Sequence, residues 1–135
     1  MSNERGKIRN PNSIARLRDF SGLRWGVITP TDIDAFMDFG GKVFVFIEAK
    51  HHKGTMPKGQ RLAYERLSSA CSSGGVHSIV FVIEHGDEKL IDYGKLSVVE
   101  FWNNKEWVKM DGRPLREAIR QYRIHCENID RDAVK

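Results

Sequence analysis

Two runs of consecutive apolar residues stand out in the chain, and both are typical of strands that are buried on both faces. Residues 42–50 contain the run Val-Phe-Val-Phe-Ile, and residues 77–85 contain Ile-Val-Phe-Val-Ile. A strand with one face in water would alternate apolar and polar residues, so these runs predict central strands of a covered sheet. Weaker patterns predict further strands at residues 23–29, 32–39, 96–102 and 106–110.

Apolar residues at helical spacing predict three helices. One covers roughly residues 58–72 and ends at Gly74-Gly75, and another runs from Pro114 to about Glu127. A short helix is predicted over residues 13–20. The resulting order is helix, three strands, helix and strand, followed by two strands and a helix. This order predicts an α/β fold in which helices cover a mixed sheet, and 135 residues suffice for one such domain, residues 1–135.

Charged residues interrupt the apolar pattern at the end of the 42–50 strand. Glu48 and Lys50 are two residues apart, so both side chains lie on one face of the strand, roughly 7 Å apart along it. Burying such charges is unfavourable unless they are paired or bind a metal ion. The neighbouring 32–39 strand carries Asp32 and Asp34 on a single face. These carboxylates are the natural partners for the charges at the strand end.

The turn at Gly40-Gly41 decides whether the carboxylates of the two strands meet. A two-residue hairpin would pair Phe39 with the residue after the glycines and would turn Glu48 away from Asp34. A three-residue loop or a glycine bulge shifts the pairing by one residue. Phe39 then pairs with Val43, and Asp34 faces Glu48. We therefore expect the three-residue loop or the bulge if these residues form a site.

Two carboxylates on adjacent strands form a site of oxygen ligands. Asp34, Glu48 and the backbone carbonyl of Ala49 are the expected ligands, with Asp32 as an alternative to Asp34. Mg²⁺ prefers such ligands, and Mn²⁺ can substitute for it. A phosphodiester is a suitable substrate, because a metal ion can polarise a phosphoryl oxygen and activate water. The ammonium of Lys50 could orient that water or stabilise the developing charge.

At this point the residues resemble a known family. Asp34, thirteen further residues and then Glu48-Ala49-Lys50 resemble the PD-(D/E)XK nuclease superfamily. Gln60 and Tyr64 on the next helix are similar to the QxxxY motif of its RecB-like branch, which is related to Holliday-junction resolvases. The resemblance covers roughly residues 14–85. It implies a restriction-endonuclease-like αβββαβ core with a mixed central sheet flanked by helices.

The resemblance also implies an activity and the roles of individual residues. It implies a metal-dependent deoxyribonuclease, more readily an endonuclease than an exonuclease, that acts as a homodimer and is of phage or mobile-element origin. Asp34 and Glu48 would bind the metal ion, while Lys50 and Gln60 would serve catalysis. Tyr64 would contact the site or the DNA.

The charge of the chain is compatible with a nucleic-acid partner. The net charge is +4 and the isoelectric point is about 9.2, which is mildly basic. Residues 1–11 read as a flexible basic arm. We expect DNA as the partner, with RNA as the alternative. The expected contacts besides Tyr64 are His52, Lys53, Lys58, Arg61, Arg5, Lys7 and Arg9.

The sequence also limits the cellular setting and leaves other interpretations open. No apolar run approaches the roughly 20 residues of a membrane span, and the charged N-terminus does not resemble a secretory signal. We expect a cytoplasmic protein, in the host cytoplasm if it is phage-encoded. One alternative is a non-catalytic module of the same fold that binds nucleic acid or protein. Another is a solvent-facing salt bridge at the strand end. A coincidental Glu-x-Lys pair would place the Asp34 and Glu48 side chains far apart.

Overall fold

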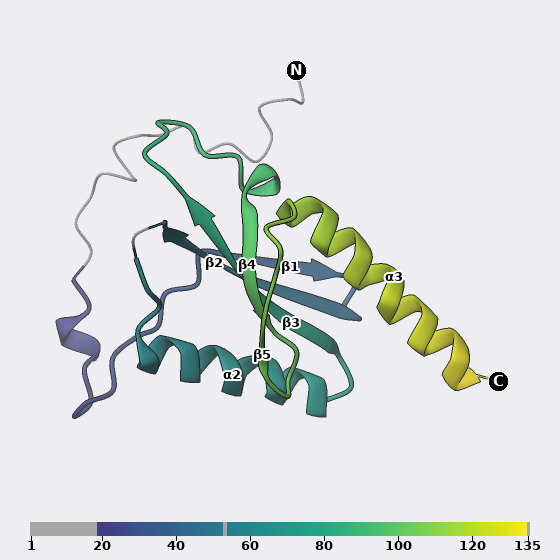
Figure 1. Ribbon diagram of the computed structural model, residues 1–135. Helices are drawn as coiled ribbons and strands as arrows, with labels where there is room; N and C mark the ends of the chain where they lie inside the picture. The colour runs from purple at the N-terminus through teal and green to yellow at the C-terminus, as the bar shows by residue number, and fades with distance from the viewer. Residues whose placement is uncertain (1–18, 53, 135) are drawn as a thin grey trace, which may run out of the picture. The chain divides into compact units, whose positions relative to one another are not determined.

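The computed structural model describes residues 19–52 and 54–134 of the chain (Figure 1). The chain divides into two units, Met1–Pro30 and Thr31–Lys135. The second unit contains the sheet and the long helices. The expectations for the basic arm of residues 1–11, including Arg5, Lys7 and Arg9, lie outside the described residues.

A five-stranded mixed sheet forms the centre of the described part of the second unit. The strands follow one another in sequence order, and β2 and β3 run parallel while every other neighbouring pair is antiparallel. The sheet contains β1 (Ala35–Phe39), β2 (Val43–His51), β3 (His77–His85), β4 (Ser97–Trp102) and β5 (Trp107–Lys109). The expected α/β class with a mixed sheet is confirmed.

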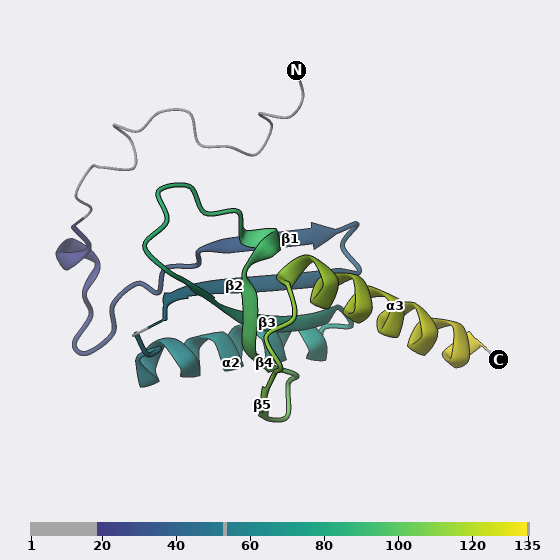
Figure 2. The ribbon, with the colours of Figure 1, turned by 45° about the horizontal axis from the view of Figure 1, so that its top comes forward.

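Helices cover the two faces of this sheet. Helix α2 (Lys58–Ser73) connects the parallel strands β2 and β3, whereas α3 (Leu115–Val134) follows β5 (Figure 2). A short 3₁₀ helix, η3 (Tyr93–Lys95), precedes β4. Alternate residues of the central strands point to opposite helices, because successive strand side chains face opposite ways.

Two hydrophobic clusters result from this alternation. Val45, Ile79 and other strand residues pack with Leu115 and Ala118 of α3. Phe46, Val80 and Val82 pack with Tyr64 of α2 on the opposite face. Both faces of β2 and β3 are therefore buried, as the uninterrupted apolar runs predicted.

The loop between β1 and β2 has the register that the site requires. Phe39 pairs with Val43, so the connection has three residues and the expectation of a three-residue loop is confirmed. Gly40 and Gly41 have φ angles of 65° and 74°, in the left-handed region that favours glycine. The amide of Gly41 also donates a 2.7 Å hydrogen bond to the carboxylate of Asp38.

Replacing Gly41 with alanine should lower the free energy of unfolding by about 1–2 kcal/mol, because a Cβ atom is strained at positive φ. Gly59 is a matched control, since it lies in α2, has no positive φ, and has free space where a Cβ atom would be placed. Gly59→Ala should leave stability unchanged or raise it by up to about 1 kcal/mol. Urea unfolding measures both. Equal losses in both variants would contradict the assigned loop conformation.

The N-terminal part of the expected nuclease order is different in the structure. The expected strand at 23–29 is wrong: Ser21–Leu23 forms the 3₁₀ helix η2, and Trp25 makes a single bridge with Ile28. The two backbone hydrogen bonds of this bridge close a turn at Gly26, whose φ is 65°, so the segment pairs with itself. Most of the expected helix at 13–20 lies outside the described residues. In residues 19–52 and 54–134, two strands instead of the expected three therefore precede α2, and the αβββαβ order is not confirmed.

Two element boundaries also differ from the expectation. The strand expected at 32–39 begins only at Ala35, and the last helix continues past Glu127 to Val134. The expected helix end was placed at the last residues of the apolar stripe that the sequence showed. The helix continues beyond it, and Asp130 of this last part lies 2.7 Å from the His77 ring at the start of β3.

Candidate active site

The site lies where the start of β1 meets the end of β2. Ala35 pairs with Ile47, and continuing this register by one residue places Asp34 opposite Glu48. The amide of Ala49 donates a 2.8 Å hydrogen bond to Oδ2 of Asp34. Asp34 is therefore fixed to the end of the strand that carries Glu48, immediately before β1 begins.

Glu48 is the buried centre of the site. Only 4% of its surface is exposed, in a strand position that is otherwise apolar. The hydroxyl of Tyr64 donates a 2.7 Å hydrogen bond to its Oε1 atom, and Nζ of Lys50 lies 3.0 Å from its Oε2 atom. Both carboxylate oxygens thus have a donor, as a buried charge requires.

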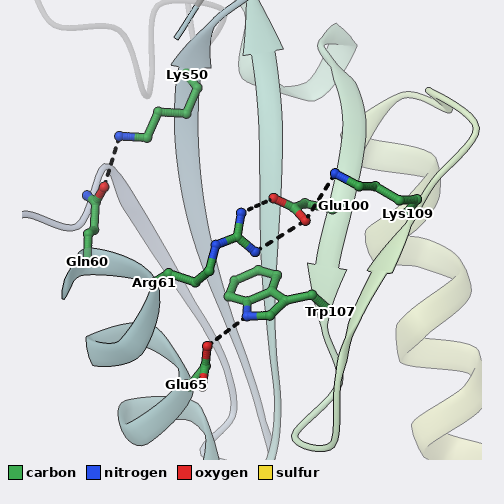
Figure 3. A network of polar contacts seen from close by, with 7 residues as sticks. All are labelled: Lys50, Gln60, Arg61, Glu65, Glu100, Trp107 and Lys109. Atoms are coloured by element: carbon green, nitrogen blue, oxygen red, sulfur yellow. Dashed lines mark hydrogen bonds and ion pairs between the residues drawn. The ribbon is translucent and has the colours of Figure 1, made fainter. Parts of the chain in front are cut away.

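Gln60 connects this cluster to the first turn of α2. Lys50 donates a 2.9 Å hydrogen bond from Nζ to Oε1 of Gln60, which Figure 3 shows between β2 and the helix. Glu48 and Lys50 from β2 therefore meet Gln60 and Tyr64 from α2. The four residues that the sequence singled out on this strand and helix form one connected group.

Asp34 and Glu48 interact electrostatically. The pKa of Asp34 is raised, first by desolvation of its carboxyl group and then by the negative charge of Glu48, while the hydrogen bond from Ala49 opposes the rise. The nearby charge of Asp32 raises the same pKa further. Two neighbouring carboxylates are a common arrangement for binding a divalent cation, whose positive charge offsets their repulsion.

Tyr64 is a buried residue that donates a hydrogen bond to Glu48. Its pKa is raised, first by burial and then by the hydrogen bond to Glu48, so the hydroxyl stays protonated and remains a donor. Only 1% of its surface is exposed. In this conformation the side chain has no surface for the expected nucleic-acid contact, because it lies behind Glu48. Its place in the structure is that of a residue that positions the Glu48 carboxylate.

The variant Tyr64→Phe should lower the free energy of unfolding by about 1–3 kcal/mol, because a buried charged acceptor loses a donor. Tyr122→Phe is the matched control on the opposite face of the sheet, where the Tyr122 hydroxyl lies against the weakly polar thiol of Cys126. Its loss should be smaller. Chemical denaturation of both variants makes the comparison, and equal losses would contradict the role assigned to the Tyr64 hydroxyl.

The described residues offer few protein ligands to a divalent cation. Among residues 19–52 and 54–134, no group of three or more His, Cys, Asp or Glu side chains is arranged to hold a metal ion. Asp34 and Glu48 supply two carboxylates, which is the number that Mg²⁺ commonly takes from a protein while it keeps several waters. The residues therefore fit a hydrated Mg²⁺ or Mn²⁺ ion, and they do not form a closed protein cage.

The residues that were expected to contact nucleic acid differ in their exposure and in their partners. His52 and Lys58 are exposed, and Lys53 lies outside the described residues. Arg61 is instead engaged with the carboxylate of Glu100 through two hydrogen bonds of 3.3 and 2.5 Å. A guanidinium held in this way is less available to a phosphate than a free surface arginine would be.

Two residues near the site were missed by the sequence reasoning. Glu100 is only 6% exposed, and the signal for it was present: like Glu48, it interrupts an apolar strand with a charge. The pKa of Tyr93 in η3 is raised by burial and then by the charges of Asp34 and Glu48. Nothing in the sequence around Tyr93 indicated this interaction.

Two simpler interpretations of the strand end do not fit the geometry. The ion pair between Glu48 and Lys50 does form, but its carboxylate is buried, so it is not the solvent-facing salt bridge considered above. A coincidental motif would leave Asp34 and Glu48 far apart, whereas Ala35 pairs with Ile47 and the amide of Ala49, the residue after Glu48, donates a 2.8 Å hydrogen bond to Asp34.

Comparisons with known proteins add no family assignment. Within the described residues, no helix has both the length and the apolar character needed to cross a bilayer. The chain was compared with protein-family models, curated proteins and solved structures, and none of the three comparisons found a match.

Proposed function

We propose that the protein is a metal-dependent nuclease that hydrolyses phosphodiester bonds in DNA, with Asp34, Glu48 and Lys50 at its centre. The observation that carries the proposal is the buried carboxylate of Glu48, placed opposite Asp34 and 3.0 Å from the Lys50 ammonium. A central strand ending in such a group is unfavourable for folding alone. A catalytic or binding role accounts for it.

Each residue has a defined part in this proposal. Asp34 and Glu48 would hold Mg²⁺, with Mn²⁺ as a substitute, and the Ala49 carbonyl would be a further ligand. When bound, the cation would supply polarisation of the phosphate and acidification of water. Lys50, held by Gln60, would present its ammonium to the charge that builds up on the phosphoryl oxygens.

The substrate class and the assembly are proposed from the charge of the chain and from the resemblance of its motif. The net charge of +4 and the exposed ammonium of Lys58 favour a polyanion. The resemblance of the motif to PD-(D/E)XK nucleases supports DNA over RNA, endonucleolytic cutting and a homodimer. A non-catalytic binding module remains the competing function.

Cleavage of labelled single-stranded, duplex and four-way-junction DNA tests the proposal. The assay compares Mg²⁺, Mn²⁺ and EDTA, and it compares the wild type with Glu48→Ala. Lys105→Ala is the matched control, because it removes an exposed cation of the loop between β4 and β5, outside the Glu48 cluster and the expected nucleic-acid contacts. We expect metal-dependent cutting that Glu48→Ala abolishes and Lys105→Ala retains. Binding of DNA without cutting under any condition would replace the nuclease with the binding module.

A further inference from the structure

Glu100 is a buried charge on the same face of the sheet as the candidate active site. Val82 of β3 pairs with Glu48 on one side and with Glu100 on the other, so the two glutamates flank it in one row across the sheet. Strands are spaced about 4.8 Å apart, which separates the two backbones by roughly 10 Å. Glu100 belongs to β4, outside the motif residues of β1, β2 and α2.

A bulge in β4 turns Glu100 toward α2. Ile83 pairs with Val98 and Val82 pairs with Glu100, which leaves Val99 as an extra residue in β4. Val98 packs in the α3 cluster. In a regular strand without a bulge, Val98 and Glu100 are two residues apart and would lie on that same side. Bulges often re-aim a side chain beside an active site, and this one brings a carboxylate to the helix that carries Gln60 and Tyr64.

Arg61 holds Glu100 from the helix side. Its Nη1 and Nη2 atoms donate to the two carboxylate oxygens, and its guanidinium lies 4.3 Å from the ring centroid of Trp107 (Figure 3). Nε1 of Trp107 donates a 2.9 Å hydrogen bond to Glu65, one turn further along α2. Lys109 is 3.7 Å from Glu100 but is itself 86% exposed, so Arg61 is the principal partner.

The first turn of α2 depends on these contacts for its position. No side chain caps the helix at Pro57, so the turn lacks the usual local anchor. Consecutive residues tie it instead to two strands. Gln60 accepts from Lys50 of β2, and Arg61 donates to Glu100 of β4.

We propose that Glu100 is a positioning residue for the candidate active site: by holding Arg61, it fixes the first turn of α2 and thereby sets Gln60 against Lys50. This inference rests on the proposed nuclease function for its catalytic consequence. Its structural part concerns the contact between Gln60 and Lys50 and can be measured separately. Glu100 would touch neither substrate nor metal ion.

The kinetic test compares Glu100→Gln, Arg61→Gln and the double variant. We expect each single variant to lower kcat at least tenfold while KM changes less than threefold, because the site loses alignment rather than binding surface. The double variant should lose no more than either single variant, since both break one contact. Glu65→Gln is the matched control, because it removes a carboxylate charge from the same helix face and leaves the ion pair intact, while glutamine can still accept the hydrogen bond from Trp107. Multiplied losses in the double variant, or an unchanged kcat in both single variants, would overturn the proposal.

The structural test uses the side-chain amide resonances of the folded protein. The Gln60 amide signal should move in Glu100→Gln and in Arg61→Gln but stay in place in Glu65→Gln. The Asn104 amide, which is bound to Ser78 on the other side of the network, is the internal control and should not move. If Glu100→Gln does not fold, Arg61→Gln carries the test alone.

The two tests separate the inference from the function on which it rests. A wild-type protein that cuts no DNA but shows the Gln60 shift in both variants would end the nuclease proposal and retain the positioning contact. A Gln60 resonance that does not respond to either substitution would overturn the positioning role, whatever the wild type does to DNA.

Discussion

Replacing Lys50 with methionine is expected to lower the single-turnover rate of DNA cleavage roughly a hundredfold to a thousandfold, the usual effect of removing one group that stabilises transition-state charge. The side chain is only 21% exposed, and its ammonium is fixed between Glu48 and Gln60. Methionine keeps the length and the apolar stem but removes the charge. The fold should therefore persist while the chemistry slows.

The same variant separates catalysis from metal binding. Lys50 neutralises part of the Glu48 charge, so its removal should leave the affinity for Mn²⁺ unchanged or raise it. Titration calorimetry with Mn²⁺ measures the affinity, and rapid-quench kinetics measures the rate. Lys105→Met, in the exposed loop between β4 and β5, should leave both unchanged. If Lys50→Met loses cation binding together with activity, Lys50 serves the architecture of the site rather than the reaction.

The sequence predicted the elements around the site because burial there produces a strong pattern of apolar residues. The strand at 77–85 was placed with its observed bounds, since uninterrupted apolar residues on a fully buried strand admit few alternatives. The register of β1 on β2 followed from the requirement that Asp34 face Glu48. The expected contact between Asp34 and Glu48 thus predicted a three-residue loop, which backbone propensity alone left open.

The expectations that failed concern segments where local backbone geometry overrides the pattern of the sequence. Residues 23–29 have the composition of a strand, yet the turn at Gly26 lets Trp25 pair with Ile28, and no ladder extends from it. The charge of Glu100 interrupts an apolar strand, but the direction of its side chain could not be predicted, because it depends on a bulge in β4 and a single extra residue leaves no periodic trace in a six-residue strand. Its partner Arg61 was consequently assigned to the nucleic acid.

Replacing Asp34 with asparagine is expected to remove the response of the protein to divalent cations. A ligand substitution should weaken Mg²⁺ binding by more than about a hundredfold, since even residues that only support metal ligands account for 10–100-fold in affinity. At a Mg²⁺ concentration of about 100 times its Kd, the wild type should gain about 2.7 kcal/mol of folding free energy and the variant almost none. Thermal unfolding with and without Mg²⁺ measures this difference.

The same substitution should change the pH dependence of stability in a defined direction. The pKa of Asp34 is raised in the folded chain by desolvation and by the charge of Glu48, above its ordinary value of 3.8. Folding therefore favours the protonated carboxyl. Its contribution is complete below about pH 3.8 and is lost as the pH rises through the raised pKa. Without metal at neutral pH, Asp34→Asn should consequently be more stable than the wild type.

Saturating Mg²⁺ should reverse that order, because the cation binds the ionised pair and offsets the repulsion that the variant lacks. Asp38→Asn is the matched control on the same strand, since asparagine can still accept the hydrogen bond from Gly41. It should keep the full response to Mg²⁺. If Asp34→Asn also keeps that response, Asp34 is not the ligand and Asp32, the alternative on the same segment, becomes the residue to replace. A wild type that is stabilised by neither Mg²⁺ nor Mn²⁺ would contradict the assignment of Asp34 and Glu48 as the ligands of a divalent cation.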